Sequence, residues 1–266
     1  MVTTVQAPER WPRPDFDDAR PQPRFLFIVT PPYSGSTALA ELINTSSKTL
    51  FLHAGGEGQW LVPGMCEKPR WDPARTFDFE SIKAVWLSRY QSLQSSAGSV
   101  DTVIEKSPPN MLRLDRFVEV FDDVAIMANN RQPHAHCSSV LFRNHAATEL
   151  SSSRRLEIVR DAAHGWLKRS ELIAHIVEKY QAPLLTYEQF CKDPARLLDR
   201  LPLPSHVTAD IDTNASVSVK DYAPQAIVDQ NQKQVARLSD EEIQAVDTVV
   251  ASRPDLLTFF SYSLSP

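Results

Sequence analysis

The fold is decided by residues 25–37, which read FLFIVTPPYSGST. Residues 25–29 are all apolar and rich in aromatic and β-branched types, which is typical of a strand buried on both faces of a parallel sheet. Turn-forming residues follow, and apolar residues then recur at helical spacing over residues 38–44. This order of strand, tight loop and helix predicts the opening of a βαβ unit.

The rest of the chain continues this alternation. Apolar segments predict further strands at residues 49–52, 102–104, 124–127 and 183–187. Amphipathic spacing predicts helices near residues 78–94, 109–121, 156–177, 194–200 and 239–252. We therefore expect an α/β fold with a central, mostly parallel sheet flanked by helices, in one domain over residues 24–266. Residues 1–23 are rich in proline and charge and are expected to form an N-terminal arm or tail. The polar residues 204–235 are expected to form a loop or lid.

Composition and charge exclude several classes of protein. The 266 residues are 42% hydrophobic and 23% charged, which is ordinary for a globular protein. A net charge of -5 provides no general basic surface for nucleic acid, so an anionic ligand needs a local site. Three separated cysteines without a C-x-x-C pair argue against a disulfide framework or a zinc ribbon. We see no signal peptide and no stretch that could cross a bilayer, so we expect a cytoplasmic protein.

The loop after the first strand has the composition of a phosphate-binding turn. Gly35 allows close approach of the backbone, and successive N–H groups at a helix N-terminus point toward one spot. The hydroxyls of Ser34, Ser36 and Thr37 add donors, although the same residues also suit an ordinary N-capped turn. The loop lacks the first glycine and the lysine of a Walker A sequence, which argues against a nucleoside-triphosphate kinase.

A second anion site is predicted after the strand at residues 124–127. Arg131 follows that strand, and Ser139 comes eight residues later, at the start of the next predicted helix. A guanidinium group offers two parallel donors to a phosphate, and a serine hydroxyl completes the contact. An arginine in a loop also commonly forms a surface ion pair. The interpretation of Arg131 as a phosphate ligand therefore depends on its combination with the phosphate-binding turn after the first strand.

Together the two sites resemble those of the PAPS-dependent sulfotransferases, most closely the bacterial and carbohydrate-type enzymes. These transfer a sulfuryl group from 3′-phosphoadenosine-5′-phosphosulfate (PAPS) to an acceptor. Residues 32–37 look like the family's 5′-phosphosulfate loop, P-[KR]-[SG]-G-[ST]-[TS], and Arg131-x-Pro133 with Ser139 looks like its 3′-phosphate motif. Residues 185–194 and 219–231 resemble the Y-E-D-L…D-P stretch and the C-terminal cofactor loop.

The resemblance covers about residues 24–262 and implies a P-loop-NTPase-like sulfotransferase fold. It implies PAPS as donor and adenosine 3′,5′-bisphosphate (PAP) as product, and a small-molecule, carbohydrate or lipid acceptor with a hydroxyl or amine. A metal ion is not expected, because a sulfuryl group carries less negative charge than a phosphoryl group and no residues have metal-ligand spacing. The implied cofactor-binding residues are Tyr33, Ser34, Gly35, Ser36, Thr37, Ala38, Arg131, Ser139, Tyr187 and Lys220.

Three residues are candidates for the chemistry. Lys106 lies in Glu105-Lys106-Ser107-Pro108, which is similar to the E-K-[ST]-P stretch in which the lysine faces the sulfate and the acceptor. In-line transfer needs a general base for the acceptor, and the resemblance favours Glu57, in a glycine-containing segment after the second strand. His53 competes for this role, because histidine ordinarily exchanges protons near neutral pH.

The chain departs from the family at Tyr33. The family carries a lysine or arginine there, which contacts the sulfate and stabilises the charge that develops on the leaving phosphate. A tyrosine donates one hydrogen bond but brings no charge, so either Lys106 covers this role or transfer is slow or absent. Two alternatives stay open: a P-loop-type nucleotide-dependent kinase, which shares the opening strand, loop and helix, and a catalytically weak or inactive binding protein with the sulfotransferase fold, which Tyr33 supports.

Aromatic and histidine side chains complete the candidates. Aromatic residues usually belong to the core, but an acceptor pocket could be lined by Phe51, Trp60, Trp71 and Trp86. Three histidines lie near the second phosphate motif, but no set of acidic or cysteine residues around them has metal-ligand spacing. We interpret these as helix-face or surface residues rather than ligands: His134, His136 and His145.

Overall fold

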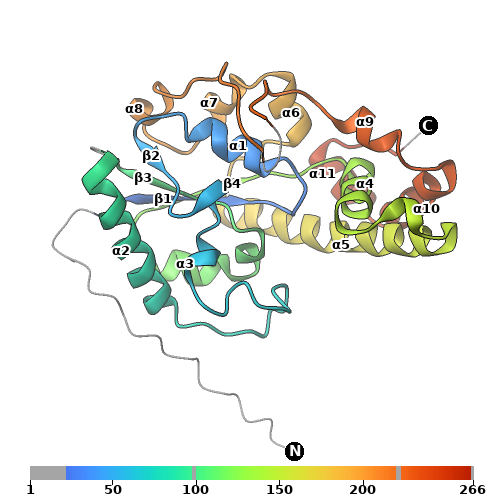
Figure 1. The fold of residues 1–266 in the computed structure, drawn as a ribbon, viewed down its shortest axis with the longest axis horizontal. Coiled ribbons are helices and arrows are strands. Elements are labelled where there is room, and N and C mark those ends of the chain that lie inside the picture. The colour runs from blue at the N-terminus through green and yellow to red at the C-terminus, as the bar shows by residue number, and fades with distance from the viewer. Residues whose placement is uncertain (1–21, 98–99, 220–222, 265–266) are drawn as a thin grey trace, which may run out of the picture.

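The computed structural model describes residues 22–97, 100–219 and 223–264. Within them, four parallel strands form a sheet in the order β2-β3-β1-β4 (Figure 1). The strands are β1 (Arg24–Val29), β2 (Thr49–Leu50), β3 (Thr102–Glu105) and β4 (Val124–Ala128). β1 is central and pairs with β3 on one side and with β4 on the other. The predicted α/β class with a parallel sheet is confirmed.

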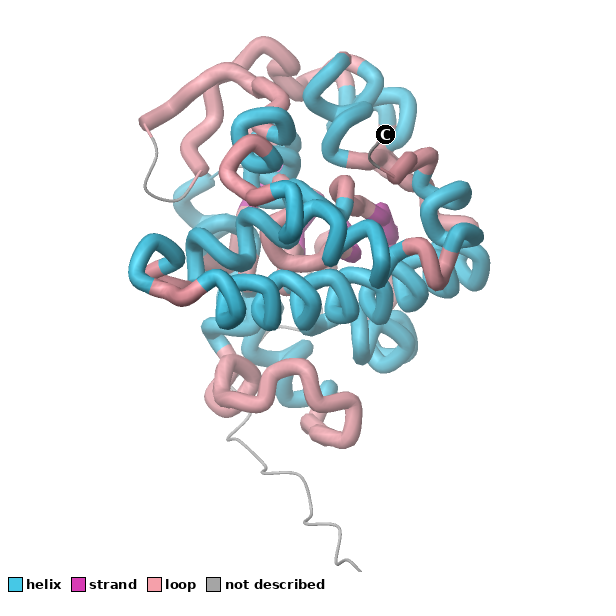
Figure 2. The backbone as a smooth tube through the Cα atoms, turned by 90° about the vertical axis from the view of Figure 1, so that its right-hand side faces the viewer, coloured by secondary structure: helices cyan, strands magenta, loops and turns pink. Residues whose placement is uncertain are grey.

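Helices cover both faces of this sheet, and Figure 2 shows the strands in the interior with helices around them. The α-helices of the described residues are α1 (Ser36–Ile43), α2 (Phe79–Ala97), α3 (Leu114–Val120), α4 (Pro133–Asn144), α5 (Ser152–Tyr180), α6 (Tyr187–Lys192), α7 (Arg196–Arg200), α8 (Ser205–Thr208), α9 (Asn231–Val235), α10 (Asp240–Val250) and α11 (Pro254–Phe260). None of these helices is both long and apolar enough to cross a bilayer.

Both faces of β1 are buried, as its uninterrupted apolar sequence predicts. Phe25 and Phe27 belong to one core cluster with Trp86 of α2, and the ring centroids of Phe25 and Trp86 are 5.9 Å apart. Leu26 and Ile28 belong to a second cluster on the opposite face, with apolar residues of α1, α6 and α7. Alternation along one strand therefore joins the two helical layers.

Several predicted elements differ from the structure. The strand predicted at residues 183–187 is wrong except for one bridge, in which Leu184 pairs with Ala128 at the end of β4. The chain then turns into α6, because the Thr186 hydroxyl accepts from the backbone N–H of Gln189, whose side chain accepts in return from the backbone N–H of Thr186. The helix predicted at 109–121 is divided into the 3₁₀ helix η3 (Pro108–Arg113) and α3.

Two predicted segments include residues that the structure does not describe. The proposed loop or lid at 204–235 contains α8 and α9, helices of four and five residues that are too short to show periodicity in the sequence. The proposed N-terminal arm lies outside the described residues up to residue 21, and Lys220 also lies outside them.

Candidate functional site

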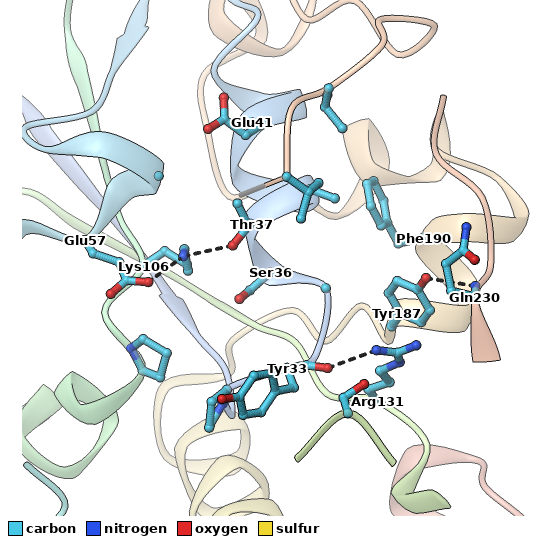
Figure 3. A pocket seen from close by; sticks show the side chains of 18 of the residues that line it. Tyr33, Ser36, Thr37, Glu41, Glu57, Lys106, Arg131, Tyr187, Phe190 and Gln230 are labelled. Carbon is cyan, nitrogen blue, oxygen red and sulfur yellow. Dashed lines mark hydrogen bonds and ion pairs between the residues drawn. The ribbon is translucent and has the colours of Figure 1, made fainter. Parts of the chain in front are cut away.

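The carboxyl ends of β1, β3 and β4 open into one cavity of about 830 Å³. Because the strands are parallel, the loops that follow them meet at the same edge of the sheet, where open α/β sheets bind ligands. Gly35 after β1, Lys106 after β3 and Arg131 after β4 all line this cavity. Figure 3 shows these three loops around one space. The first loop and the distant arginine therefore share a cleft.

The loop after β1 is shaped by residues with left-handed backbone conformation. Gly35 is the N-cap of α1 and has φ 76°, and a Cβ atom there would lie 2.3 Å from the Tyr187 ring. Only glycine both adopts this positive φ without strain and leaves room for the Tyr187 ring. Tyr33 has φ 65°, which is unusual for an aromatic residue. Ser34 is fully buried, and its hydroxyl has no partner among the described residues.

The side chain of Tyr33 is directed toward α4. Its hydroxyl donates to Oδ1 of Asn144, the last residue of that helix, and its ring meets the buried His136 ring with centroids 6.4 Å apart. The backbone carbonyl of Tyr33 accepts a hydrogen bond of 3.1 Å from Nη1 of Arg131. Arg131 and the first loop, which form the two predicted anion sites, are therefore in direct contact. The contact is made by the backbone of Tyr33 rather than by its side chain.

Arg131 is held from several sides. It is only 6% exposed, its Nε donates to Oδ1 of Asn231 at 2.8 Å, and its guanidinium lies 4.3 Å from the centroid of the Tyr187 ring. Its carbonyl accepts from the indole N–H of Trp166 at 2.8 Å. Nη2 is buried and has no acceptor among the described residues. A fixed guanidinium with an unused donor fits a phosphate, and the hydroxyl-bearing Ser139 lines the same cavity.

Tyr187 connects this arginine to the C-terminal segment. Its hydroxyl donates to the carbonyl of Val228 and accepts from the backbone N–H of Gln230, both at 3.1 Å. Asn231 donates from Nδ2 to the Glu188 carboxylate at 2.6 Å. Residues 228–231, at the end of the stretch that resembles a cofactor loop, are therefore fixed beside Arg131, as Figure 3 shows for Gln230.

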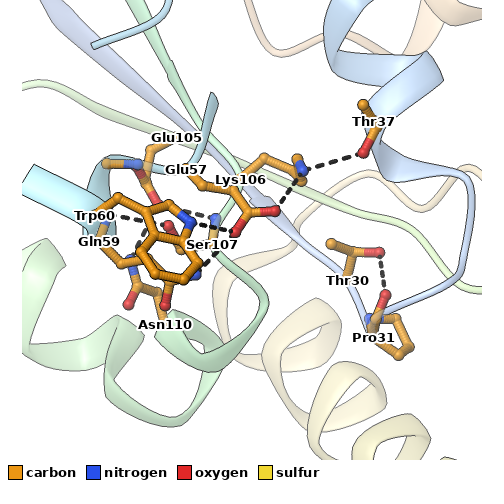
Figure 4. Close-up of polar contacts among 11 residues, drawn as sticks. Thr30, Pro31, Thr37, Glu57, Gln59, Trp60, Glu105, Lys106, Ser107 and Asn110 are labelled. Atoms are coloured by element: carbon orange, nitrogen blue, oxygen red, sulfur yellow. Dashed lines mark hydrogen bonds and ion pairs between the residues drawn. The ribbon is translucent and has the colours of Figure 1, made fainter. Parts of the chain in front are cut away.

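The buried Lys106 and the partly exposed Glu57 form an ion pair at the other end of the cleft. Lys106 is 2% exposed, and its Nζ lies 3.1 Å from Oε1 of Glu57 and 3.2 Å from Oγ1 of Thr37 (Figure 4). Oε2 of Glu57 accepts from Gln59 at 2.9 Å and from the indole N–H of Trp60 at 3.1 Å. Burial opposes ionisation, but the Lys106 ammonium and these hydrogen bonds hold the pKa of Glu57 below its usual value.

Two carboxylates beside the cleft are not among the site residues predicted from the sequence. Glu105, at the end of β3, is fully buried, and burial raises its pKa to about 7 against the opposing hydrogen bonds from Ser107 and Gly58. A charged residue ending an apolar strand was the available signal. Glu41 of α1 lines the cavity, and burial raises its pKa while the Lys106 charge opposes the shift. No sequence signal distinguishes the half-buried Glu41 from exposed carboxylates on other helices.

Some candidate residues lie elsewhere. His53 is exposed and is not among the residues that line the cavity, so the structure does not bring it to Lys106. Trp60 and Trp71 do line the cavity. The expectation for Trp86 is wrong, since it is fully buried in the core, and Phe51 packs against the core cluster of the opposite face without lining the cavity.

The histidine interpretation also needs correction. His134 and His136 are on helix α4, as expected, but both are fully buried, whereas His145 is exposed. His134 has an acidic partner far along the chain, because its Nε2 lies 2.9 Å from Oδ1 of Asp247. Burial, together with the charges of Arg169 and Arg131, lowers the pKa of His136 to about 3. Among the described residues, no three or more His, Cys, Asp or Glu side chains gather as a metal site.

No protein-family model and no curated protein matches the sequence. Solved structures do match the fold. A sulfotransferase from Alicyclobacillus acidocaldarius has a TM-score of 0.55 and 14% identity, over 92% of this chain and 98% of that one. Sulfotransferase STF9 from Mycobacterium avium has a TM-score of 0.52 and 14% identity, over 92% and 79%. The sulfotransferase domain from the curacin biosynthetic pathway has a TM-score of 0.50 and 18% identity, over 91% and 99%. The chain therefore has the sulfotransferase fold.

Proposed function

We propose that the protein is a PAPS-dependent sulfotransferase that transfers a sulfuryl group to a hydroxyl or amine of an acceptor. The observation that carries this proposal is the direct bond from Arg131 to the backbone of the first loop, inside a cavity that Lys106 also lines. Two anion-binding ends with a lysine beside them suit a nucleotide that has phosphate groups on both sides of its ribose. The sulfotransferase fold supports the same reading.

The donor end of the cleft would hold the nucleotide. The backbone N–H groups of residues 35–37 and the hydroxyls of Ser36 and Thr37 would bind the 5′ end, and Ala38 continues this helix turn along the cavity wall. Arg131 and Ser139 would bind the 3′-phosphate, for which the unused Nη2 of Arg131 provides a donor. Tyr187 would wall the space between them. PAPS, when bound, supplies the sulfuryl group and a stable leaving group.

The transfer end would perform the chemistry. Lys106 brings the positive charge that Tyr33 does not, and an ammonium group beside the reacting atoms stabilises charge on the leaving phosphate. Glu57 would accept the proton of the acceptor, held in orientation by Gln59 and Trp60. The two roles are coupled, since a shift of Lys106 away from Glu57 removes the cation that lowers the pKa of Glu57 and makes this carboxylate a stronger base.

Two measurements test the proposal. Calorimetry should show binding of PAP in the presence of EDTA, and weaker binding of ATP with magnesium; a preference for magnesium-ATP would instead indicate a kinase. Incubation with ³⁵S-labelled PAPS and a panel of sugars, phenols and alcohols should label an acceptor. A protein that binds PAP but labels none of them, before and after Tyr33→Lys, would be a binding protein with this fold.

A further inference from the structure

The carboxylate of Glu105 contacts two separate segments of backbone beside the Lys106–Glu57 pair. Oε2 accepts from the backbone N–H of Gly58 at 2.8 Å, and Oε1 accepts from the backbone N–H of Ser107 at 2.9 Å. Oε1 also accepts from Nδ2 of Asn110 at 3.0 Å. Figure 4 shows this carboxylate beside Glu57, Lys106 and Ser107. Both of its oxygens are therefore engaged by N–H donors.

The two backbone donors are the immediate neighbours of the proposed chemical groups. Gly58 directly follows Glu57, and Ser107 directly follows Lys106. The two segments also meet where the backbone N–H of Lys106 donates to the carbonyl of Gly56 at 2.7 Å. A Cβ atom at Gly58 would lie 2.5 Å from Oε2 of Glu105 and 3.0 Å from the Trp86 ring, so this glycine allows the backbone to reach the carboxylate.

The burial of Glu105 is costly and is not offset by a cation. It is 2% exposed, and no lysine or arginine among the described residues forms an ion pair with it. The adjacent Lys106 pairs with Glu57 instead. An apolar side chain at a buried position is commonly as stable as a buried charge, or more stable. Stability alone therefore gives no reason for a carboxylate here, whereas three convergent N–H donors do.

We propose that Glu105 is a positioning residue, whose carboxylate ties the segment carrying Glu57 to the segment carrying Lys106 and so sets the distance between these two side chains. The inference deepens the proposed sulfotransferase function and rests on it, because Glu57 and Lys106 act together only in that chemistry. Glu105 itself touches the reacting groups only through the backbone amides of Gly58 and Ser107.

Glu105→Gln tests this directly. The new amide nitrogen faces the N–H of either Gly58 or Ser107, so one of the two backbone ties is lost whichever way the side chain is turned. We expect sulfuryl transfer to fall about 100-fold, the effect of a displacement of about 1 Å in a catalytic site. Affinity for PAP should not change. The indole ¹H–¹⁵N signal of Trp60, assigned with Trp60→Phe, should shift because this N–H donates to Glu57.

Asn110→Ala is the matched control. It removes one hydrogen bond from the same carboxylate but leaves both backbone ties, so the transfer rate and the Trp60 signal should stay as in the wild type. Equal losses in Asn110→Ala and Glu105→Gln would overturn the proposal, as would a wild-type rate and signal in Glu105→Gln. If Glu105→Gln does not fold, Gly58→Ala displaces the same tie from its other side and should give the same pattern; wild-type behaviour would overturn the proposal.

The Trp60 signal separates this inference from the proposed function. A wild-type protein that neither binds PAP nor transfers sulfate would end the sulfotransferase proposal. In that case a shifted Trp60 signal in Glu105→Gln, with an unchanged signal in Asn110→Ala, would still show that Glu105 positions Glu57.

Discussion

The two ends of the cleft are built in different ways. At the donor end, Arg131 is fixed by neutral groups, namely the carbonyl of Tyr33, the amide of Asn231 and the ring of Tyr187. At the transfer end, Lys106 already has an anionic partner in Glu57. The charge of Arg131 is therefore available to a ligand, whereas that of Lys106 is shared with the proposed base. In the proposed function, the 3′-phosphate contact and the group transfer would thus depend on residues that follow different strands, β4 and β3.

This difference explains how the chain could retain chemistry without a cation at position 33. The Tyr33 side chain bonds to Asn144 of α4, while Lys106 reaches Thr37 from the neighbouring strand. Because β1 and β3 are paired in parallel, the end of β3 lies beside the loop that follows β1. A positively charged side chain can therefore reach this part of the cleft from the end of either strand, and here Lys106 reaches it from β3.

The largest effect is expected from Glu57→Gln. The amide cannot accept the acceptor's proton, so single-turnover transfer from labelled PAPS should slow by about 10²–10⁴-fold. Affinity for PAP, measured by calorimetry, should change little, because Glu57 lies at the transfer end. His53→Gln is the control and should keep the wild-type rate. The reverse outcome, with the loss in His53→Gln, would move the base to the exposed histidine.

Lys106→Ala should reduce the same rate by about 10²–10³-fold, the effect of removing one group that stabilises developing charge. It also removes the cation that lowers the pKa of Glu57. The pKa of that carboxyl should rise, so the remaining activity should begin to fall at a higher pH on acidification than in the wild type. Rates measured between pH 4 and pH 8 check this, and an unchanged acid limb would show that the pair is not coupled.

Tyr33→Phe should have the smallest effect. The variant loses the bond to Asn144 and about 0.5–1.5 kcal/mol of unfolding free energy, as is usual for one hydrogen bond. The transfer rate should stay near that of the wild type, because the hydroxyl is directed at α4. Urea denaturation and single-turnover assays measure the two quantities. A large loss of rate with unchanged stability would place the Tyr33 hydroxyl in the chemistry.

The parts of the site that could be predicted are those encoded locally. The apolar run of β1, the glycine at position 35 and Arg131 just after β4 are each readable within a few residues, and parallel pairing then brings them to one edge. The rest depends on contacts between distant residues. The hydrogen bond from Gly58 to Glu105 and the pairing of His134 with Asp247 have no signature in a single sequence. The apolar residues around Leu184 predict a strand, whereas the structure has only a single bridge there. An apolar run does not show where a helix cap interrupts it.

The central claim is that one nucleotide spans the cleft from the first loop to Arg131. The direct test is calorimetry of PAP and of adenosine 5′-monophosphate with the wild type and with Arg131→Ala. Loss of a charge-assisted bond should weaken the binding of PAP by about 10- to 150-fold. The affinity for the monophosphate should stay unchanged, because this nucleotide has no 3′-phosphate. Equal losses for both nucleotides, or none for PAP, would contradict the account.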